Sequence, residues 1–543
     1  MLKQDPWKPH PLSPEEIQTI RQQSRKLHMD YLRQHAYVRM LKDRPLDTAE
    51  ERQRLALVVY KYEAEMMKTY ISYQLVFWRT FPIHDLPVEI LSNIIRYVVW
   101  SATSSPVGIR WRLQLTWVSR YLRHIAISDS TLWNAIWFRA KPPFERPLAF
   151  IERSRTSPLD LRIDDTPTYR FTDQGICSLL ETLTPHLHHI RILIILLENW
   201  EPILSVLKWL SDYGKEKHRP LTMERFEIHR TGNPYLWPGL VWRGTKFNPV
   251  NHAISLYSLF GGRHVPELKS FTMNGIHIDW ANTHSLNNLT ALDLRRIPLE
   301  LCPPLPCFLQ ILASSLMLNR LSLDGAGPAG NPPTISNYPT VNLPHLHTLI
   351  LANFAFPFPK SIVSHFTAPN VKDLTLMNFK MPNYGPFYEF MTDRFQKIKL
   401  LTLASVSCPI DTVLPVMIKW LDSMPLLAYA RLNDLEPDIL QAFLFDPDTM
   451  KIHPDLPPPL RTAFVSPRLN VLEVETIRPN TFTKFVLARK LCGVPVKKTY
   501  MARSMAKDFS DAALTDINRH FTSLALVDVG AKTREEKDLL NEP

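Results

Sequence analysis

The chain has 543 residues, 45% of them apolar and 21% charged, which is enough material for two or more folded domains. Its 15 glycines stand against 47 prolines, and so little glycine counts against phosphate-binding loops, where the backbone must approach the ligand closely. The formal net charge of +11 would suit nucleic acid or an acidic membrane surface, but the basic residues are scattered, so we do not expect a nucleic-acid partner.

The cysteines and the apolar runs bear on the compartment. None of the five cysteines forms a Cys-x-x-Cys pair, and an odd number in so long a chain indicates a reducing environment without a disulfide framework. The opening "MLKQDPWKPHPLSPEE" has no apolar signal core. The longest strongly apolar run, Ile192 to Leu197, is too short to span a bilayer. We therefore expect no membrane span and a cytoplasmic and/or nuclear location.

Residues 1–14 are rich in proline and are expected to be flexible, and two long helices are predicted over 15–80. Ser13 and Glu16 have capping-box spacing at the start of the first helix, and Thr48 is the expected cap of the second. A short turn between the helices predicts an antiparallel hairpin. Whether this hairpin dimerises stays open, because its apolar stripe is not a clean heptad.

A small helical unit is predicted over residues 81–138. Its first helix has Asp85 as the expected cap and Pro87 in the first turn. This helix carries an apolar stripe at intervals of four residues, Leu86, Ile90, Ile94 and Val98, with Leu91 and Ile95 alongside. A second helix follows, and then "DSTLWNAIWF" with Asp129 as its expected cap. The tryptophans of this unit, Trp111, Trp117, Trp133 and Trp137, are expected to pack in its core.

From about residue 158 to 480, short phrases of the form Leu-x-x-Leu-x-Leu recur. The clearest are "LTALDL", "LNRLSL", "LHTLIL", "VKDLTL", "IKLLTL" and "LAYARL", which begin at Leu289, Leu318, Leu346, Val371, Ile398 and Leu427. Steps of 25 to 29 residues, each with one short strand, are typical of a leucine-rich repeat solenoid, an α/β repeat in which each coil buries its apolar face against the next. Asn353 and Asn378 stand where this pattern places a turn asparagine.

The predicted repeat contains insertions, and the segment after it is less regular. The aromatic-rich insertion Pro234 to Phe260 is a candidate recognition loop. Residues 481–530 are predicted to form a helical cap on the solenoid, and 531–543 a flexible tail.

No motif in the sequence predicts catalysis, a metal site or a cofactor. The segment that contains His186, His188 and His189 has the same pattern as "PHLHTLIL" at 344–351, with Pro-His-Leu-His before a predicted strand. We therefore assign these histidines to the repeat pattern and not to a metal site. "CPPLPC" has the wrong spacing for a structural zinc pair, and no Gly-Lys-Ser/Thr follows the glycines of "DGAGPAG". We expect a non-enzymatic protein without a cofactor.

The unit from Ile83 to Phe138 resembles an F-box. "DLPVEILSNIIRYV" is similar to the opening of that motif, "WVSRYLRHIA" to its middle helix and "DSTLWNAIWF" to its ending, and the three pieces occur in the family's order. Together with the helical hairpin before it and the repeats behind it, the chain resembles the large fungal, basidiomycete-type F-box family with C-terminal leucine-rich repeats. The sequence departs from the family at Leu122, where many members carry tryptophan.

This resemblance implies the substrate receptor of an SCF-type ubiquitin ligase, which docks on the adaptor Skp1 and through it on a cullin while the repeats hold a protein substrate. By position, the residues expected to meet Skp1 are Leu86, Pro87, Glu89, Ile90 and Leu91, and those expected to add to the contact or support it from within are Val118, Ser119 and Leu122. Such a receptor carries no chemistry of its own, since ubiquitin transfer belongs to other subunits. Three alternatives remain: the apolar stripe packs on the hairpin instead, the chain is a protein-binding scaffold without a role in degradation, or, as its charge alone suggests, it binds nucleic acid or a membrane surface.

Overall fold

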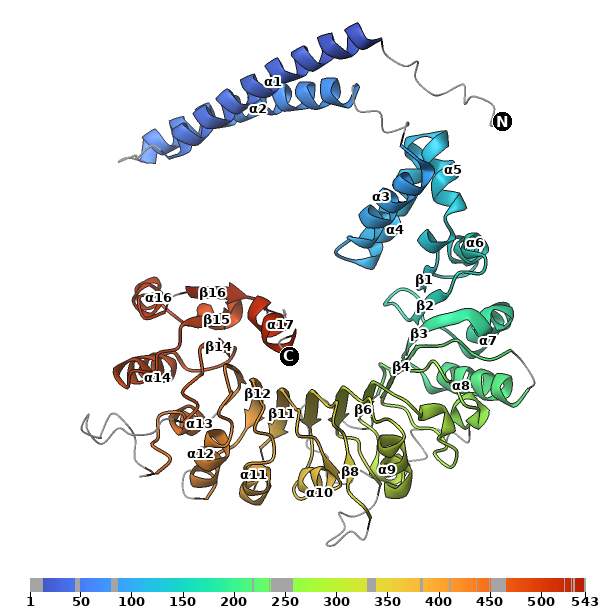
Figure 1. Cartoon of the computed structure of the whole chain (residues 1–543), viewed down its shortest axis with the longest axis vertical. Coiled ribbons are helices and arrows are strands. Elements are labelled where there is room, and N and C mark those ends of the chain that lie inside the picture. Colours follow the sequence, from blue (N-terminus) through green and yellow to red (C-terminus); the bar gives the residue numbers. More distant parts are fainter. Residues whose placement is uncertain are drawn as a thin grey trace. The chain divides into compact units, whose positions relative to one another are not determined.

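The computed structural model describes residues 13–43, 49–79, 86–216, 219–233, 235, 257–329, 338–380, 384–409, 412–435, 437–448, 450, 465–521, 523–528, 530 and 533–541. The chain divides into two compact units, 1–133 and 134–543. The first unit is helical and the second is built on one long parallel sheet (Figure 1).

The first unit begins with a hairpin of two long helices, α1 (Pro14–Lys42) and α2 (Ala49–Arg79). The predicted capping box is confirmed, since the Glu16 amide donates to Ser13 Oγ at 3.2 Å and the Ser13 amide donates to Glu16 Oε2 at 2.8 Å. The helices are antiparallel, because the His28 ring stacks on Tyr73 at 4.7 Å between centroids, whereas Lys42 at the far end pairs with Glu63. The expected cap Thr48 lies outside the described residues.

Three short helices complete this unit, and we call residues 86–133 the three-helix segment. They are α3 (Val88–Trp100), α4 (Ser105–Val118) and α5 (Arg120–Ser128), followed by a single 3-10 turn, η2 (Ser130–Leu132). Asp129 caps that turn as predicted, accepting from the Thr131 amide at 3.2 Å. The expected cap Asp85 lies outside the described residues.

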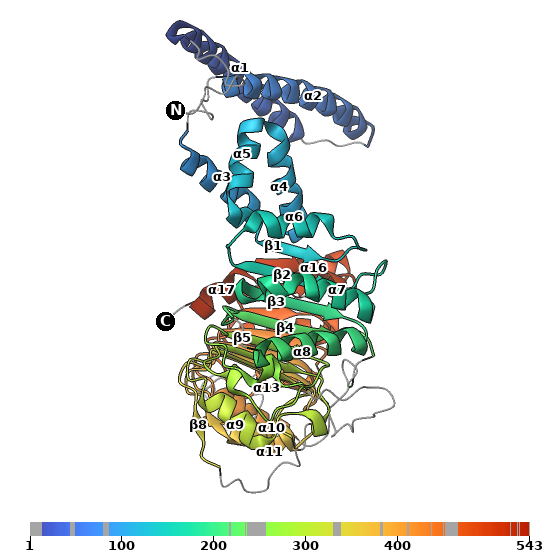
Figure 2. The same ribbon diagram turned by 90° about the vertical axis from the view of Figure 1, so that its right-hand side faces the viewer.

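The second unit, which we call the solenoid, is a sheet whose strands follow one another in chain order. In the described part of the chain its 14 strands are β1 (Ala135–Phe138), β2 (Leu159–Asp164), β3 (Ile190–Leu197), β4 (Arg225–Arg230), β5 (Ser270–Asn274), β6 (Ala291–Arg295), β7 (Arg320–Asp324), β9 (Thr348–Ala352), β11 (Asp373–Phe379), β12 (Leu400–Val406), β13 (Tyr429–Asn433), β14 (Val471–Val474), β15 (Lys498–Ala502) and β16 (Ser523–Val527). All neighbours pair in parallel, and Figure 2 shows the first five stacked in order. All six predicted strand phrases are confirmed as strands of this sheet.

Apart from α17 (Arg534–Asn541), which is described below, the helices cover one face of the sheet (Figure 1). The solenoid helices are α6 (Glu145–Ser154), α7 (Asp173–Leu183), α8 (Trp200–Lys215), α9 (Leu305–Ala313), α10 (Phe358–Ser364), α11 (Gly385–Met391), α12 (Leu414–Asp422), α13 (Pro437–Ala442), α14 (Pro479–Leu491), α15 (Arg503–Ala506), α16 (Asp511–Asn518) and α17 (Arg534–Asn541), and a small pair of strands, β8 (Val341–Asn342) and β10 (Phe366–Thr367), lies beside the main sheet. Alternation along each strand turns leucines toward the helices, as for Leu292 and Leu294 of β6, both at most 1% exposed. The intervening side chains face away from the helices, and we call this side the strand face.

A left-handed backbone position recurs just after the aligned part of each strand from β5 to β13. The residues are Gly275, Arg296, Gly325, Asn353, Asn378, Ser405 and Asp434, with φ between 47° and 66°. Asparagine tolerates this conformation better than most residues because its side chain bonds locally. Here it also joins coils: Asn378 Nδ2 donates to Asn353 Oδ1 at 2.7 Å, and Asn353 Nδ2 donates in turn to Asp324. The two predicted turn asparagines therefore form part of a ladder between coils.

The ends of the solenoid differ from the prediction. The sheet begins at β1, inside the segment assigned to 81–138, and runs through β15 and β16, so residues 481–530 are not a purely helical cap. The predicted flexible tail is also wrong for residues 534–541, which form α17 and are held by ion pairs. Of the candidate recognition loop Pro234 to Phe260, only 235 and 257–260 are described.

No helix in the described ranges is both long and apolar enough to cross a membrane. The five cysteines are free thiols, and three of them, Cys302, Cys408 and Cys492, are buried in the solenoid.

Candidate protein-binding site

The helix α3 carries two apolar stripes side by side. Leu91, Ile95 and Val99 recur every four residues and are 1–3% exposed, so they form the inner stripe. Ile90 and Ile94, one residue earlier in each turn, are 45% and 42% exposed, and they form the outer stripe with Val98. The outer stripe is apolar surface that the described chain leaves in contact with water.

Further apolar side chains are exposed at the ends of α3 and α4. Tyr97 is 78% exposed, and Trp117 and Val118, at the end of α4, are 69% and 68% exposed. Ser119 then starts α5 by accepting the Leu122 amide on its hydroxyl at 3.1 Å. So many large apolar groups on so small a segment are typical of a protein-binding surface.

Polar contacts hold the three helices in place behind this surface. Arg96 of α3 donates to Asp129 Oδ2 at 2.7 Å, and the Asp129 side chain is 4% exposed. Arg112 of α4 donates to the Leu132 carbonyl at 3.0 Å. The Trp133 indole, fully buried, donates to the Ala126 carbonyl at 2.7 Å. The outer stripe therefore stands on a braced frame, which lowers the entropy cost of binding.

The eight residues expected to meet or support an adaptor fall into three groups. Pro87, Glu89, Ile90 and Val118 are exposed, and Leu86 and Ser119 are partly exposed. Leu91 and Leu122 are only 1% and 9% exposed. The expectation that Leu91 meets a partner directly needs correction: it belongs to the inner stripe and packs in the core, and Leu122 supports the segment from within.

Sequence reasoning missed part of this surface. Trp117 was expected in the core and is exposed, whereas Trp133 packs in the core as expected. Ile94 and Val98 belong to the predicted stripe but were left out of the expected contacts. Their spacing of four and eight residues from Ile90 was the signal that could have found them.

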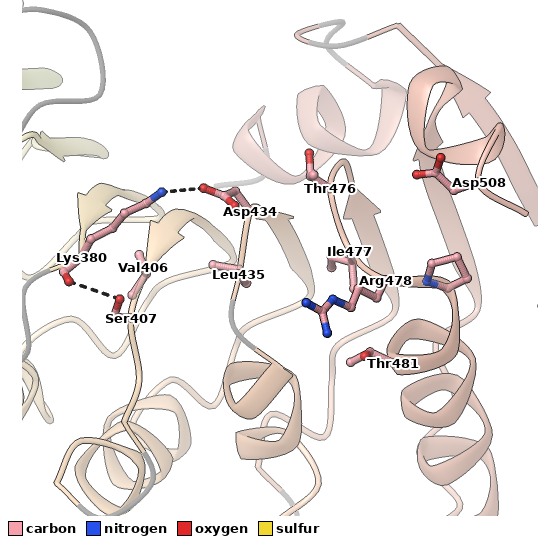
Figure 3. Close-up of a pocket in the computed structure, with 11 residues that line it drawn as sticks. Lys380, Val406, Ser407, Asp434, Leu435, Thr476, Ile477, Arg478, Thr481 and Asp508 are labelled. Carbon is pink, nitrogen blue, oxygen red and sulfur yellow. Dashed lines mark hydrogen bonds and ion pairs between the residues drawn. The ribbon is translucent and has the colours of Figure 1, made fainter.

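A second surface feature is a cleft of about 640 Å³ at the ends of the strands in the C-terminal half of the solenoid (Figure 3). Lys380 pairs with Asp434 across it at 2.8 Å, and Ser405 donates to the same carboxylate at 2.6 Å. These two hydrogen bonds lower the pKa of Asp434. Arg478 and Asp508 also line the cleft, together with the apolar side chains of Val406, Leu435 and Ile477.

The histidine triplet does not form a metal site. The His188 and His189 rings lie 4.7 Å apart, edge to face, and burial together with the neighbouring histidines lowers the pKa of His189 to about 4. Among the described residues, no group of three His, Cys, Asp or Glu side chains is placed to hold a metal ion.

No protein-family model matches this sequence, and no curated protein matches it either.

Proposed function

We propose that this chain is the substrate-receptor subunit of an SCF-type ubiquitin ligase, with the three-helix segment as an F-box that docks on Skp1 and the solenoid as leucine-rich repeats that hold a protein substrate. The observation that carries the proposal is the outer stripe of α3, where Ile90, Ile94 and Val98 stand exposed beside a buried stripe with the same spacing. Pro87 and Glu89 stand exposed at the start of the same helix.

The two units suit separate tasks. The three-helix segment displays apolar side chains in a fixed arrangement, which suits binding to a single adaptor protein. The long surface of the solenoid suits binding to a protein substrate. In this role the chain is not an enzyme and needs no cofactor; it raises the effective concentration of the substrate near the subunits that transfer ubiquitin. It would act in the cytoplasm and/or nucleus, where that machinery works.

The test is a pull-down of the full chain on purified Skp1. An Ile90→Glu variant is expected to lose binding by at least about tenfold, because a carboxylate placed in an apolar contact is desolvated. A Leu86→Ala, Pro87→Ala double variant is expected to lose binding by a similar factor, because it removes apolar contact area. Leu57→Glu is the matched control, since Leu57 is 69% exposed on the hairpin. Circular dichroism checks that each variant is folded. Full binding by Ile90→Glu would contradict the proposed docking face.

The second candidate function is a protein-binding scaffold that takes no part in degradation. The burial of Leu91 favours it, because it removes one of the five residues expected to meet Skp1 from the surface. Adding a cullin to the Skp1 complex separates the two candidates. A receptor brings the cullin into the complex, whereas a scaffold leaves it free.

A further inference from the structure

The C-terminal helix α17 lies on the strand face of the solenoid. Leu539 packs against an apolar cluster of Leu400, Tyr429, Val471 and Tyr500, which come from β12, β13, β14 and β15. In Figure 1 the helix stands on the side of β14–β16 opposite to α14 and α16. After β16 the chain thus returns and packs on a cluster to which four earlier strands contribute.

Two adjacent carboxylates fix α17 in this place. Glu535 pairs with Lys498 Nζ at 2.5 Å and accepts from the Tyr500 hydroxyl. Glu536 pairs with Arg431 at 3.0 Å, and their side chains are only 8% and 23% exposed. Burial opposes the ionisation of Glu535, but the hydrogen bonds from Lys498 and Tyr500 outweigh it and lower the pKa of Glu535.

The cationic side of these pairs is held by the solenoid itself. Arg431 Nε also donates to Glu473 Oε2 at 2.8 Å, and the Tyr429 hydroxyl donates to the same oxygen at 2.6 Å. The Glu473 side chain is 2% exposed, so it anchors Arg431 from below. With the guanidinium fixed in this way, its other edge stays available for a carboxylate above the sheet.

A structural cap would be built differently. A cap covers the apolar edge of a terminal coil, and among the described strands β16 lies at that edge, whereas α17 reaches back to Arg431 on β13, three strands away in the sheet order. A cap also needs no buried charges, because apolar packing gives comparable stability without the desolvation cost of ion pairs. Paired charges over an apolar cluster instead specify one ligand in one orientation.

We propose that the strand face of β12–β15 is a binding site for an acidic amphipathic helix of a partner protein, and that α17 occupies this site until such a partner displaces it. The site would recognise two adjacent carboxylates, which pair with Lys498 and Arg431. It would also recognise a leucine one helical turn later, which packs on the apolar cluster. If the chain is a ligase receptor, as proposed above, this pattern describes its substrate.

The displacement is within the reach of an ordinary partner. A helix of eight residues is marginal by itself, so α17 owes its helical form to the contacts it makes on the sheet. As a tethered segment it competes at an effective concentration on the order of millimolar. A partner helix with one more apolar anchor or ion pair than α17 would bind tightly enough to displace it.

The test uses the full chain and a fluorescein-labelled peptide with the sequence of residues 533–543, TREEKDLLNEP. A Glu535→Lys, Glu536→Lys variant places like charges against Lys498 and Arg431 and should release α17. We expect this released variant to bind the peptide at least about tenfold more tightly than the native chain, measured by fluorescence polarisation. A scrambled peptide of the same composition should not bind.

Two controls make the outcome decisive. Asp538→Lys reverses a charge on the exposed side of α17, where the Asp538 side chain is 67% exposed, and should behave as the native chain. Adding Lys498→Glu to the released variant should abolish peptide binding. The proposal is overturned if the released variant unfolds, if it is folded and does not bind the peptide, or if the scrambled peptide binds equally well. Because Skp1 is absent from the assay, failure here with intact Skp1 binding would refute this inference and leave the proposed function standing.

Discussion

Replacing Asn353 tests how the coils of the solenoid are joined. This residue has a φ of 59°, donates to Asp324 and accepts from Asn378 Nδ2 at 2.7 Å. Asn353→Gly and Asn353→Ala both remove two hydrogen bonds of the ladder, and at about 1 kcal/mol each the loss is about 2 kcal/mol. Alanine also has to adopt a left-handed backbone, which costs about 1 kcal/mol more, whereas glycine does not.

The expected order of stability is therefore native, Asn353→Gly, Asn353→Ala. The free energy of unfolding from urea denaturation, followed by circular dichroism, measures both steps. Asn319 is the matched control, because its side chain bonds to His347 but its φ is not positive. There alanine should be tolerated better than glycine. If alanine and glycine cost the same at Asn353, the left-handed position does not constrain the coil and the reasoning fails.

Three further predictions follow from buried polar groups. Arg489 is fully buried and donates to four backbone carbonyls. Arg489→Met should therefore lower the free energy of unfolding, measured by urea denaturation, by about 3 kcal/mol or more. A loss below about 1 kcal/mol would show that the loops that carry these carbonyls do not depend on Arg489. Burial and the neighbouring Glu536 raise the pKa of Asp373 to about 6, above its ordinary value of 3.8, so its contribution to stability is lost as the pH rises from about 4 to about 6. Asp373→Asn should therefore raise the melting temperature at about pH 8 and leave it nearly unchanged at about pH 4, and an equal effect at both pH values would contradict this. Trp133→Phe removes the indole donor to the Ala126 carbonyl. We expect the free energy of unfolding of the three-helix segment, followed by near-ultraviolet circular dichroism, to fall by about 1–2 kcal/mol. No change in this free energy would mean that water replaces the indole as the donor.

The strands of the solenoid could be predicted because their side chains repeat a physical requirement. Each coil must bury alternating leucines against the helices, so the spacing from Leu289 to Leu427 is visible in the sequence. β15 and β16 were missed because "KTYMA" and "SLALV" lack the full Leu-x-x-Leu-x-Leu pattern. Both also follow segments whose sequence predicts helices. They are strands because they continue the parallel ladder of β14.

The candidate site was predictable in outline and not in detail. Ile90 and Leu91 are adjacent, equally apolar and part of stripes with the same spacing, so sequence alone does not say which faces inward. The packing of α4 and α5 decides this, and it buries Leu91. The tail was missed because "TREEKDLLNEP" is highly charged, and its helix depends on Lys498 and Arg431, which are distant in the sequence.

The most direct test of the account is a calorimetric titration of purified Skp1 into the full-length chain, with an Ile90→Glu, Ile94→Glu variant beside it. The account predicts one-to-one binding by the native chain, weakened by at least about tenfold in the variant, while both proteins keep the same circular dichroism spectrum. The absence of binding by the folded native chain, or equal binding by the variant, would contradict the assignment of the outer stripe of α3 as an adaptor-docking face.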